Sequence, residues 1–308
     1  MFTPFILQDK LLFKFTDILT VIMIRSRNYV LLCLAALLVS SSCAAIRYTE
    51  NFTFFQMADT QFGFFNENKE FSKETRNFEK AIAETNRLRP AFVIVCGDLV
   101  NKPGDMAQIN EYKRISGTLD PAIKIYNVSG NHDVENAPTG SALNFYREHF
   151  GPDRYTFRSG NIFGIVLNSS LIKDPSKAPD EAAAQEAWVR VALEDGKVSG
   201  SRNIIIFMHH PFFLNSADEP NEYFNIDLER RKMYLDLFDK YNVRQIFAGH
   251  YHRNASGRSG NIEMITTGPV GRPLGSDSSG FRIVSVNGTS LTHKYYALDS
   301  LPATLKLK

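Results

Sequence analysis

Hydrophobic and polar positions alternate along the chain with two different periods. Short apolar runs rich in Val, Ile and Phe predict buried strands, and apolar positions three or four residues apart between them predict helices. The predicted strands cover residues 92–96, 123–128, 162–167, 204–208 and 243–248, and the predicted helices cover residues 70–89, 181–194 and 228–241. A further apolar run, "FTFFQMA", precedes Asp59. This alternation of strands and helices indicates an α/β fold.

The pattern changes after residue 248. Three short strand-like runs, at residues 262–267, 281–286 and 291–298, are joined by turns rich in Gly and Ser. Because no helix separates these runs, we expect the chain to end in an antiparallel portion of sheet.

The first 45 residues differ from the rest. From Met23 the chain has two arginines, an apolar core and then small residues as far as Ala45, which is the arrangement of a secretory signal peptide. The segment before Met23 is apolar but interrupted by charges, and we interpret it as a mispredicted start or an extra leader segment; an amphipathic anchor helix is the alternative. We therefore predict a leader over residues 1–45 and one domain over residues 46–308.

The leader predicts a secreted, periplasmic or lipid-anchored protein, with a cytoplasmic location as the alternative. Cys43 is a candidate for the lipidated first residue of a bacterial lipoprotein, which would attach the protein to a membrane. Within residues 46–308 the sequence has one cysteine, Cys96, and its apolar surroundings predict buried packing.

Composition narrows the class of partner. With 44% hydrophobic and 22% charged residues, the chain has the composition of a soluble globular protein. A formal net charge of +2 gives no broad basic surface, so nucleic-acid binding is not predicted.

Five of the predicted strands are followed by polar side chains that can bind a metal. These side chains are Asp59, Asp98, Asn131 with His132 and Asp133, His209 with His210, and His250 with His252. Because the carboxyl ends of strands in an α/β sheet share one edge, we expect a single site there. Carboxylate and amide oxygens mixed with imidazole, without thiolate, suit Mn²⁺, Fe²⁺ or Zn²⁺. The set is larger than one tetrahedral ion needs, which points to two ions.

The motifs "GDLV", "GNHD", "HHP" and "GHYH", in this order, resemble the signature of the calcineurin-like metallophosphoesterases. The resemblance runs from about residue 52 to residue 298. Segments such as "ADTQFGFF" and "VSGNHDVENAPT" are closest to the calcineurin-like phosphoesterase domain-containing protein 1 group, whose members are described as metal-dependent phosphatases with protein Ser/Thr phosphatase activity. The fold that this resemblance implies is a four-layer sandwich, with two mixed β-sheets flanked by helices.

The resemblance also implies a centre of two divalent ions, of Mn, Fe, Zn or Mg. The implied ligands are Asp98 as the bridge, Asp59 and His252 for the first ion, and Asn131, His209 and His250 for the second. Two such ions about 3.5–4 Å apart lower the pKa of a bridging water, and the resulting hydroxide attacks phosphorus in line.

Gln61 occupies the place where most of the superfamily carries a histidine ligand. An amide oxygen is a weaker donor to a transition metal than imidazole, so we expect Gln61 to be a weak ligand and the first ion to be held loosely. The closest group also carries Gln there, which argues against decay of the site. The alternative is that Gln61 only hydrogen-bonds loop backbone and that the first ion does not bind.

The resemblance assigns His132 as the general acid that protonates the leaving oxygen, a role that typically contributes about 10²–10⁴-fold in rate. Asp133 would orient the His132 ring and keep it cationic. The alternative is that "GNHD" is only a capped turn. Asn101 stands where purple acid phosphatases carry a tyrosine ligand, which argues against that subclass.

Substrate contacts are less defined by the sequence. The candidates are His210, Arg253, Asn254 and Arg272, with residues 212–225 as a rim over the site. His210 would line the site or simply pack, and each of the others has a solvated loop residue as its alternative. The expected function is a phosphomonoesterase acting on a phosphoprotein or a small phosphomonoester. A phosphodiesterase of the same fold and a catalytically weak scaffold that binds a partner are the alternatives, but inactive scaffolds lose several ligands, whereas here only Gln61 departs.

Overall fold

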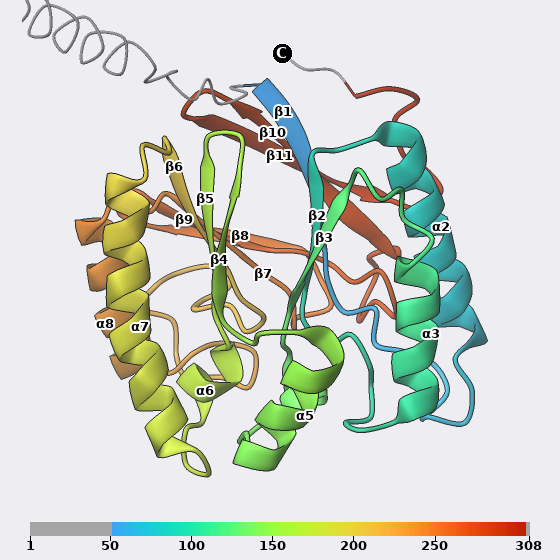
Figure 1. Ribbon diagram of the computed structural model, residues 1–308, viewed down its shortest axis with the longest axis horizontal. Helices are drawn as coiled ribbons and strands as arrows, with labels where there is room; N and C mark the ends of the chain where they lie inside the picture. Colours follow the sequence, from blue (N-terminus) through green and yellow to red (C-terminus); the bar gives the residue numbers. More distant parts are fainter. Residues whose placement is uncertain (1–50, 306–308) are drawn as a thin grey trace, which may run out of the picture. The chain divides into compact units, whose positions relative to one another are not determined.

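The computed structural model describes residues 51–305, in which two mixed β-sheets lie between layers of helices (Figure 1). The first sheet has five strands in the order β11–β10–β1–β2–β3. Their bounds are β1 (Asn51–Met57), β2 (Phe92–Cys96), β3 (Lys124–Val128), β10 (Gly280–Asn287) and β11 (Ser290–Ala297). β1, β2 and β3 are parallel, whereas β10 is antiparallel to both of its neighbours.

The second sheet has six strands in the order β4–β5–β6–β7–β9–β8. Their bounds are β4 (Tyr155–Ser159), β5 (Ile162–Val166), β6 (Asn203–Phe207), β7 (Gln245–Ala248), β8 (Ala255–Ser259) and β9 (Ile262–Thr266). The four inner strands are parallel, and β4 and β8 close the two edges in antiparallel pairing.

Aromatic side chains fill much of the space between the two sheets. Phe54 and Phe92 stack with their ring centroids 4.6 Å apart, and Phe54 meets Phe207 and Phe247 edge-on at 6.0 and 5.6 Å. Because side chains alternate along a strand, the next residue, Phe55, packs in a different core on the outer face. Full burial of such a side chain is worth about 1.5–3 kcal/mol.

Helices cover the outer face of each sheet (Figure 1). α2 (Ser72–Leu88) and α3 (Met106–Ser116) share a core with the first sheet, and α7 (Pro179–Val198) and α8 (Leu228–Lys240) share one with the second. Three further helices follow β3 and β5: α4 (Asn131–Val134), α5 (Gly140–Phe150) and α6 (Ser169–Lys173). This arrangement confirms the predicted α/β class with two mixed sheets and flanking helices.

The last part of the chain corrects one expectation. The pair β10–β11 is antiparallel, as the sequence predicted, and β9 is antiparallel to β8, a strand that the sequence did not predict. However, β9 also pairs in parallel with β7, and the two antiparallel pairs belong to different sheets. The hydrophobic period shows which face of a strand is buried, but it does not identify the neighbouring strand.

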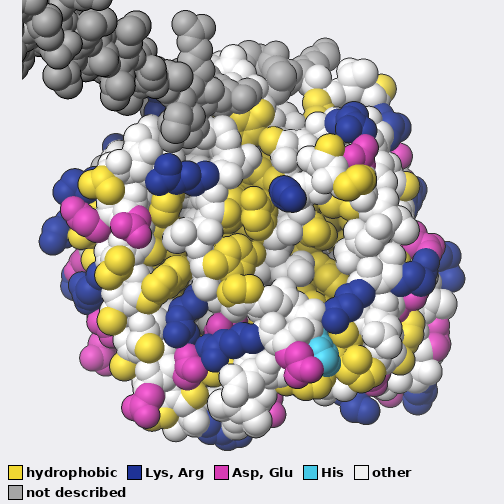
Figure 2. Space-filling view, viewed as in Figure 1, with side chains coloured by type: hydrophobic (Ala, Val, Ile, Leu, Met, Phe, Trp, Pro, Cys, Tyr) yellow, Lys and Arg dark blue, Asp and Glu magenta, His cyan; other side chains and the backbone are white. Residues whose placement is uncertain are grey.

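On the face drawn in Figure 2, hydrophobic side chains gather near the middle of the view, and basic and acidic side chains are interspersed on both flanks. The predicted leader, residues 1–45, lies outside the residues that the structure describes. Among residues 51–305, no helix combines the length and the hydropathy that a membrane span requires.

Candidate metal centre

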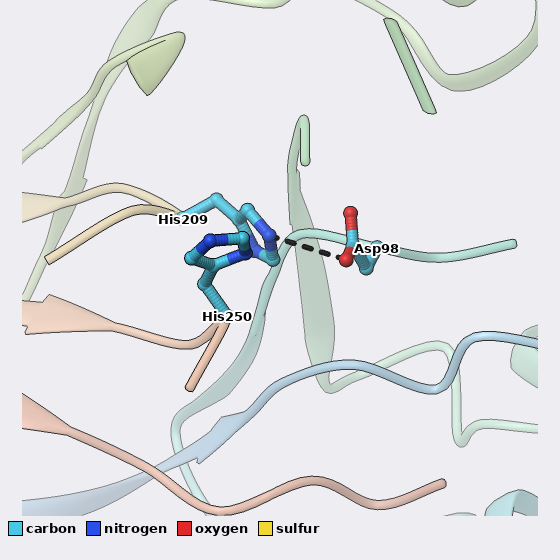
Figure 3. A group of neighbouring side chains, drawn as sticks. All are labelled: Asp98, His209 and His250. Atoms are coloured by element: carbon cyan, nitrogen blue, oxygen red, sulfur yellow. Dashed lines mark ion pairs between the residues drawn. The ribbon is translucent and has the colours of Figure 1, made fainter. Parts of the chain in front are cut away.

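The loops that follow β1, β2 and β3 meet those that follow β6 and β7. Their side chains form two groups, and within each group one candidate ligand atom per residue lies within 4.8 Å of the others. The groups are Asp59, Asp98 and His252, and Asp98, His209 and His250. All of these side chains are buried, and Asp98 belongs to both groups. Figure 3 shows the second group, with the His209 and His250 rings beside each other on one side of Asp98. The site therefore lies between the ends of two sheets and not along one sheet edge.

His209 is oriented by a backbone carbonyl. Its Nδ1 lies 2.8 Å from the oxygen of Cys96, so that Nδ1–H donates and Nε2 is left as the candidate ligand atom. Nε2 lies 3.2 Å from Asp98 Oδ2 and 3.1 Å from Asn131 Oδ1. Asn131, which the sequence assigned to the second ion, is thus joined to the group of Asp98 and His209.

His252 repeats this arrangement on the other side of Asp98. Its Nδ1 lies 2.6 Å from the carbonyl oxygen of Arg272, and its Nε2 lies 3.3 Å from Asp59 Oδ1. Asp59 also accepts the backbone N–H of His250. The contacts of Asp59 with His250 and His252 therefore join the loop after β1 to the loop after β7.

The backbone at the candidate ligands is strained. Asp59, Asp98, His250 and His252 have φ of +50°, +49°, +69° and +55°, and Gln61 has +39°. Non-glycine residues avoid this left-handed region, at a cost of about 1–3 kcal/mol each. The rest of the fold must hold these residues in place, which is typical of a functional site.

Glycines stand in the motifs where a candidate ligand side chain from another strand comes close to the backbone. A Cβ at Gly97 would lie 2.4 Å from His209 Nδ1, and a Cβ at Gly130 would lie 2.2 Å from Asp98 Oδ1. A Cβ at Gly249 would lie 2.7 Å from Asp59 Oδ2. Each glycine thus leaves room for a candidate ligand that comes from a different strand.

Opposite charges determine the protonation of the centre. Burial raises the pKa of Asp98, but the charges of His209 and His132 outweigh burial and hold that pKa below its usual range. Burial lowers the pKa of His209, but Asp98 outweighs burial and raises it to about 9. For His250, burial and then the charge of His209 lower the pKa. A proton on His209 therefore balances Asp98 when no cation does.

The His132 ring is oriented differently from the prediction. Its Nδ1 lies 2.6 Å from the carbonyl oxygen of Asn101, and its backbone N–H donates to Asp98 Oδ1 at 2.9 Å. Asp133, which was expected to orient the ring, instead accepts three backbone N–H groups, those of Leu99, Val100 and Gly130. The reason is local: Asp133 is the third residue of α4, and its carboxylate turns back to the N-terminus of that helix. Burial, followed by the charge of Asp98, raises the pKa of Asp133 to about 8.

Gln61 has one end of its amide bonded and the other unpaired. Nε2 donates to Asn101 Oδ1 at 3.2 Å, whereas the buried Oε1 has no hydrogen-bond partner among the described residues. A buried acceptor without a partner costs about 1–3 kcal/mol, so it is a rare feature that a cation would relieve. The donor set at this position therefore fits a metal ion.

The four predicted substrate residues differ in their surroundings. His210 is buried, with Nδ1 2.9 Å from Ser169 Oγ and its ring 4.3 Å from that of His250, and burial lowers its pKa. His210 thus packs against a proposed ligand, and whether it also contacts substrate stays a prediction. The guanidinium of Arg253 is exposed and lies 5.2 Å from the Tyr251 ring.

Arg272 and Asn254 are held by neighbouring loops. Arg272 lies over the Phe64 ring at 5.2 Å and donates to the Phe64 carbonyl. Asn254 donates from its backbone and side chain to Asp277 and accepts from Arg282. These contacts give Asn254 a structural role and add no support to the prediction that it binds substrate.

Sequence reasoning missed two residues that organise the centre. Asn101 contacts Gln61 through its side chain and His132 through its carbonyl oxygen. Ser169 Oγ accepts the backbone N–H groups of His209 and His210. Ser169 follows β5 in "LNSS", so the rule that polar residues at strand ends converge would have found it. The contact of Asn101 with His132 gives no such signal, because it is made by the backbone oxygen.

Comparison with known proteins identifies the family. Residues 52–254 match the calcineurin-like phosphoesterases, so the chain belongs to this family of metallophosphoesterases. The serine/threonine-protein phosphatase CPPED1 of Pongo abelii is 37% identical over 266 residues, which cover 81% of this chain and 85% of that protein. The protein of the same description from Homo sapiens is 36% identical with the same coverage.

Solved structures share the fold at low sequence identity. GAP50, the anchor in the inner membrane complex of Plasmodium, has a TM-score of 0.60 at 13% identity and covers 80% of this chain and 85% of its own. A dimetal phosphatase from Danio rerio has a TM-score of 0.57 at 15% identity and covers 80% of this chain and 96% of its own. At these identities the similarity shows the fold alone.

Proposed function

We propose that this metallophosphoesterase is a phosphomonoesterase with a centre for two divalent ions. The observation that carries the proposal is that Asp98 belongs to both groups of buried carboxylate and imidazole ligands. The Gln61 oxygen supports it, because a cation would satisfy a buried acceptor that has no partner within residues 51–305.

We propose the same division of ligands between the two ions that the family resemblance implied. The proposed ligands are Asp59, Gln61 and His252 for the first ion, Asn131, His209 and His250 for the second, and Asp98 for both. Oxygen and imidazole donors suit Mn²⁺, Fe²⁺ or Zn²⁺, and Mg²⁺ is a further candidate. When bound, such ions supply Lewis acidity to the phosphoryl oxygens and lower the pKa of water toward neutrality.

The protein's own part in proton transfer falls to His132. Its backbone N–H is fixed on Asp98, and its Nδ1 is fixed on the carbonyl oxygen of Asn101. This leaves Nε2 as the atom that gives a proton to the leaving oxygen of the substrate.

The substrate class follows from the curated relatives. They are named serine/threonine-protein phosphatases and match 81% of this chain at 36–37% identity. We propose phosphoserine or phosphothreonine peptides and small phosphomonoesters as substrates.

A panel of substrates tests this proposal. Protein loaded with Mn²⁺ is assayed with p-nitrophenyl phosphate, bis(p-nitrophenyl) phosphate, and phosphoserine and phosphothreonine peptides. We expect kcat/KM for the monoesters to exceed that for the diester. A preference for the diester would favour a phosphodiesterase, and no turnover of any substrate would favour a scaffold that keeps only the fold.

We also propose that residues 1–45 contain a leader and that the mature protein is exported, either cut near residues 44–46 or anchored through a lipidated Cys43 as its first residue. The support is the signal-peptide arrangement after Met23. Intact-mass analysis of the protein from its native host should show a start near residues 44–46, or a lipidated Cys43. Retention of residues 1–45 on a cytosolic protein would contradict this.

A further inference from the structure

Tyr223 stands over one half of the metal centre and has no role in the mechanism described above. Its ring centroid lies 5.0 Å from that of His250, and its backbone oxygen lies 3.4 Å from His250 Nε2. Burial and then the charge of Asp98 raise the pKa of Tyr223, and the Asn131 side chain opposes them, so the phenol interacts electrostatically with both Asp98 and Asn131. His250 and Asn131 are both proposed ligands of the second ion. Tyr223 is 55% exposed, so part of its side chain is open to solvent beside the centre.

The loop that carries Tyr223, residues 214–226, is held rigidly. The Glu219 carboxylate accepts the backbone N–H groups of Leu214, Asn215 and Ser216, at 2.8, 2.9 and 3.2 Å. It also accepts from the side chain of Asn225 at 2.8 Å. One carboxylate thus ties both ends of the loop together.

Two basic side chains, Arg231 and Lys173, donate hydrogen bonds to backbone oxygens of the same loop. Arg231 is fully buried, and it donates to the backbone oxygens of Ala217, Glu219 and Ile226 at 2.7–3.1 Å. Lys173 donates to the backbone oxygens of Glu222 and Asn225, the residues on either side of the two aromatic residues Tyr223 and Phe224. Burial of the Arg231 guanidinium costs desolvation energy, which its hydrogen bonds to these carbonyl oxygens offset. Because the bonds require this arrangement of the loop, they hold the loop in one position.

We propose that the Tyr223 hydroxyl binds a phosphoryl oxygen of the substrate beside Asn131 and His250, and that it selects phosphomonoesters over phosphodiesters. This inference rests on the proposed function of the centre. A monoester has three non-bridging oxygens and a diester has two. With two oxygens directed to the metal ions, only a monoester has a third that can accept from the phenol, whereas a diester would place its second substituent against the rings of Tyr223 and Phe224.

The test separates the hydroxyl of Tyr223 from its ring and backbone. Tyr223→Phe keeps the packing on His250 and the backbone contact, and removes only the hydroxyl. In Mn²⁺-loaded protein we expect its Kd for inorganic phosphate, measured by calorimetry, to rise about tenfold, which is the effect of losing one hydrogen bond to a charged oxygen. KM for p-nitrophenyl phosphate should rise similarly, and the metal content should not change.

Two further variants complete the test. Tyr223→Ala should shift the ratio of kcat/KM toward bis(p-nitrophenyl) phosphate, because it also removes the ring. Tyr241→Phe removes a hydroxyl at the end of α8, where the ring lies near Lys197 and Lys240, and should match the parent.

The outcomes distinguish this inference from the proposed function. If Tyr223→Phe binds phosphate as tightly as the parent and keeps the same ester preference, Tyr223 only packs on His250 and the inference is overturned. If the Mn²⁺-loaded parent neither binds phosphate nor hydrolyses any ester, the proposed function itself is wrong, and the inference falls with it.

Discussion

Gln61 is the residue at which we expect the first metal site to be weakened but kept. Its amide nitrogen is hydrogen-bonded to Asn101, and its buried oxygen has no partner in the part of the chain that the structure describes. The hydrogen bond to Asn101 therefore decides which end of the amide is left over for the first ion. An amide oxygen is a poorer ligand for a transition metal than imidazole, so the first ion should be the weaker one.

Replacing Gln61 tests this reading. Gln61→His should bind Mn²⁺ more tightly at the first-ion site, which is the weaker site and fills last in a titration, and both proteins should be active once Mn²⁺ is supplied in excess. In the parent, dilution or mild chelation should abolish activity, and added Mn²⁺ should restore it. Calorimetric titration with Mn²⁺ measures the difference; identical titrations of the two proteins would show that residue 61 does not contact the first ion.

A second prediction concerns His132, which is proposed to transfer a proton and not to bind metal. His132→Ala should keep its metal content and lose about 10²–10⁴-fold in kcat with phenyl phosphate. The loss should be smaller with p-nitrophenyl phosphate, because that leaving group needs less help from a proton. His149→Ala, on α5 where the ring packs on Phe145, is the matched control. Equal losses for the two esters would count against proton transfer.

The raised pKa of His209 predicts that metal binding depends on pH. Burial lowers that pKa, but Asp98 outweighs burial and raises it to about 9, so His209 is protonated at pH 7 in the absence of a cation. A ligand histidine must be neutral, so metal binding at pH 7 should release a proton, and the apparent affinity should increase from pH 6 to pH 9. Calorimetry in buffers of different ionisation enthalpy counts the proton; affinity that is constant over this range would refute the assignment.

At the scale of elements, the inner strands that are continuous apolar runs could be recognised from the sequence. β2, β5 and β6 are buried along their whole length, so hydrophobic pattern alone located them. β4 and β8 are edge strands with exposed positions along their length, and the polar sequence of β8, "ASGRS", gives no strand signal. Edge strands with one solvated face are difficult to distinguish from loops in a single sequence.

The candidate ligands could be predicted from their positions after buried strands, but the contacts that these ligands make could not. A polar residue after a buried strand is visible in the sequence, which is how Asp98 and His209 were found. The contact of His132 with the Asn101 carbonyl depends on backbone geometry, including the left-handed conformation of Asp98. No pattern of residue types encodes a hydrogen bond to a backbone oxygen. The contact predicted between Asp133 and the His132 ring was therefore wrong, because the ring contacts the Asn101 oxygen instead.

The glycines at the strand ends give a prediction for these loops. Gly249→Ala would place a Cβ 2.7 Å from Asp59 Oδ2 and 2.8 Å from the Cys96 oxygen, so the loop or Asp59 must shift. We expect a loss of about 1–3 kcal/mol in the free energy of unfolding, together with weaker metal binding. Gly140→Ala, where the Cβ would meet nothing within 4 Å, is the control and should match the parent in both measurements. An unchanged Mn²⁺ affinity in Gly249→Ala would show that the close approach does not matter.

At the scale of the whole molecule, two sheets bring their strand ends together in one centre. β1, β2 and β3 of the first sheet supply Asp59, Asp98 and Asn131, and β6 and β7 of the second supply the histidines. The aromatic layer between the sheets sets their separation, so the ligand groups depend on the packing of Phe54 and its neighbours as well as on the loops. Neither half could bind both ions by itself.

Asp98 is the one side chain that both ligand groups share, so its replacement is the most direct test of the account. Asp98→Asn and the parent are loaded with Mn²⁺, their metal content is measured by mass spectrometry, and their hydrolysis of p-nitrophenyl phosphate is compared. Asp153→Asn, which alters a buried carboxylate that pairs with Arg147, is the control for folding. We predict two ions per chain with turnover in the parent and the control, and loss of both metal and activity in Asp98→Asn. Two ions and the parent rate in Asp98→Asn would contradict the two-ion centre.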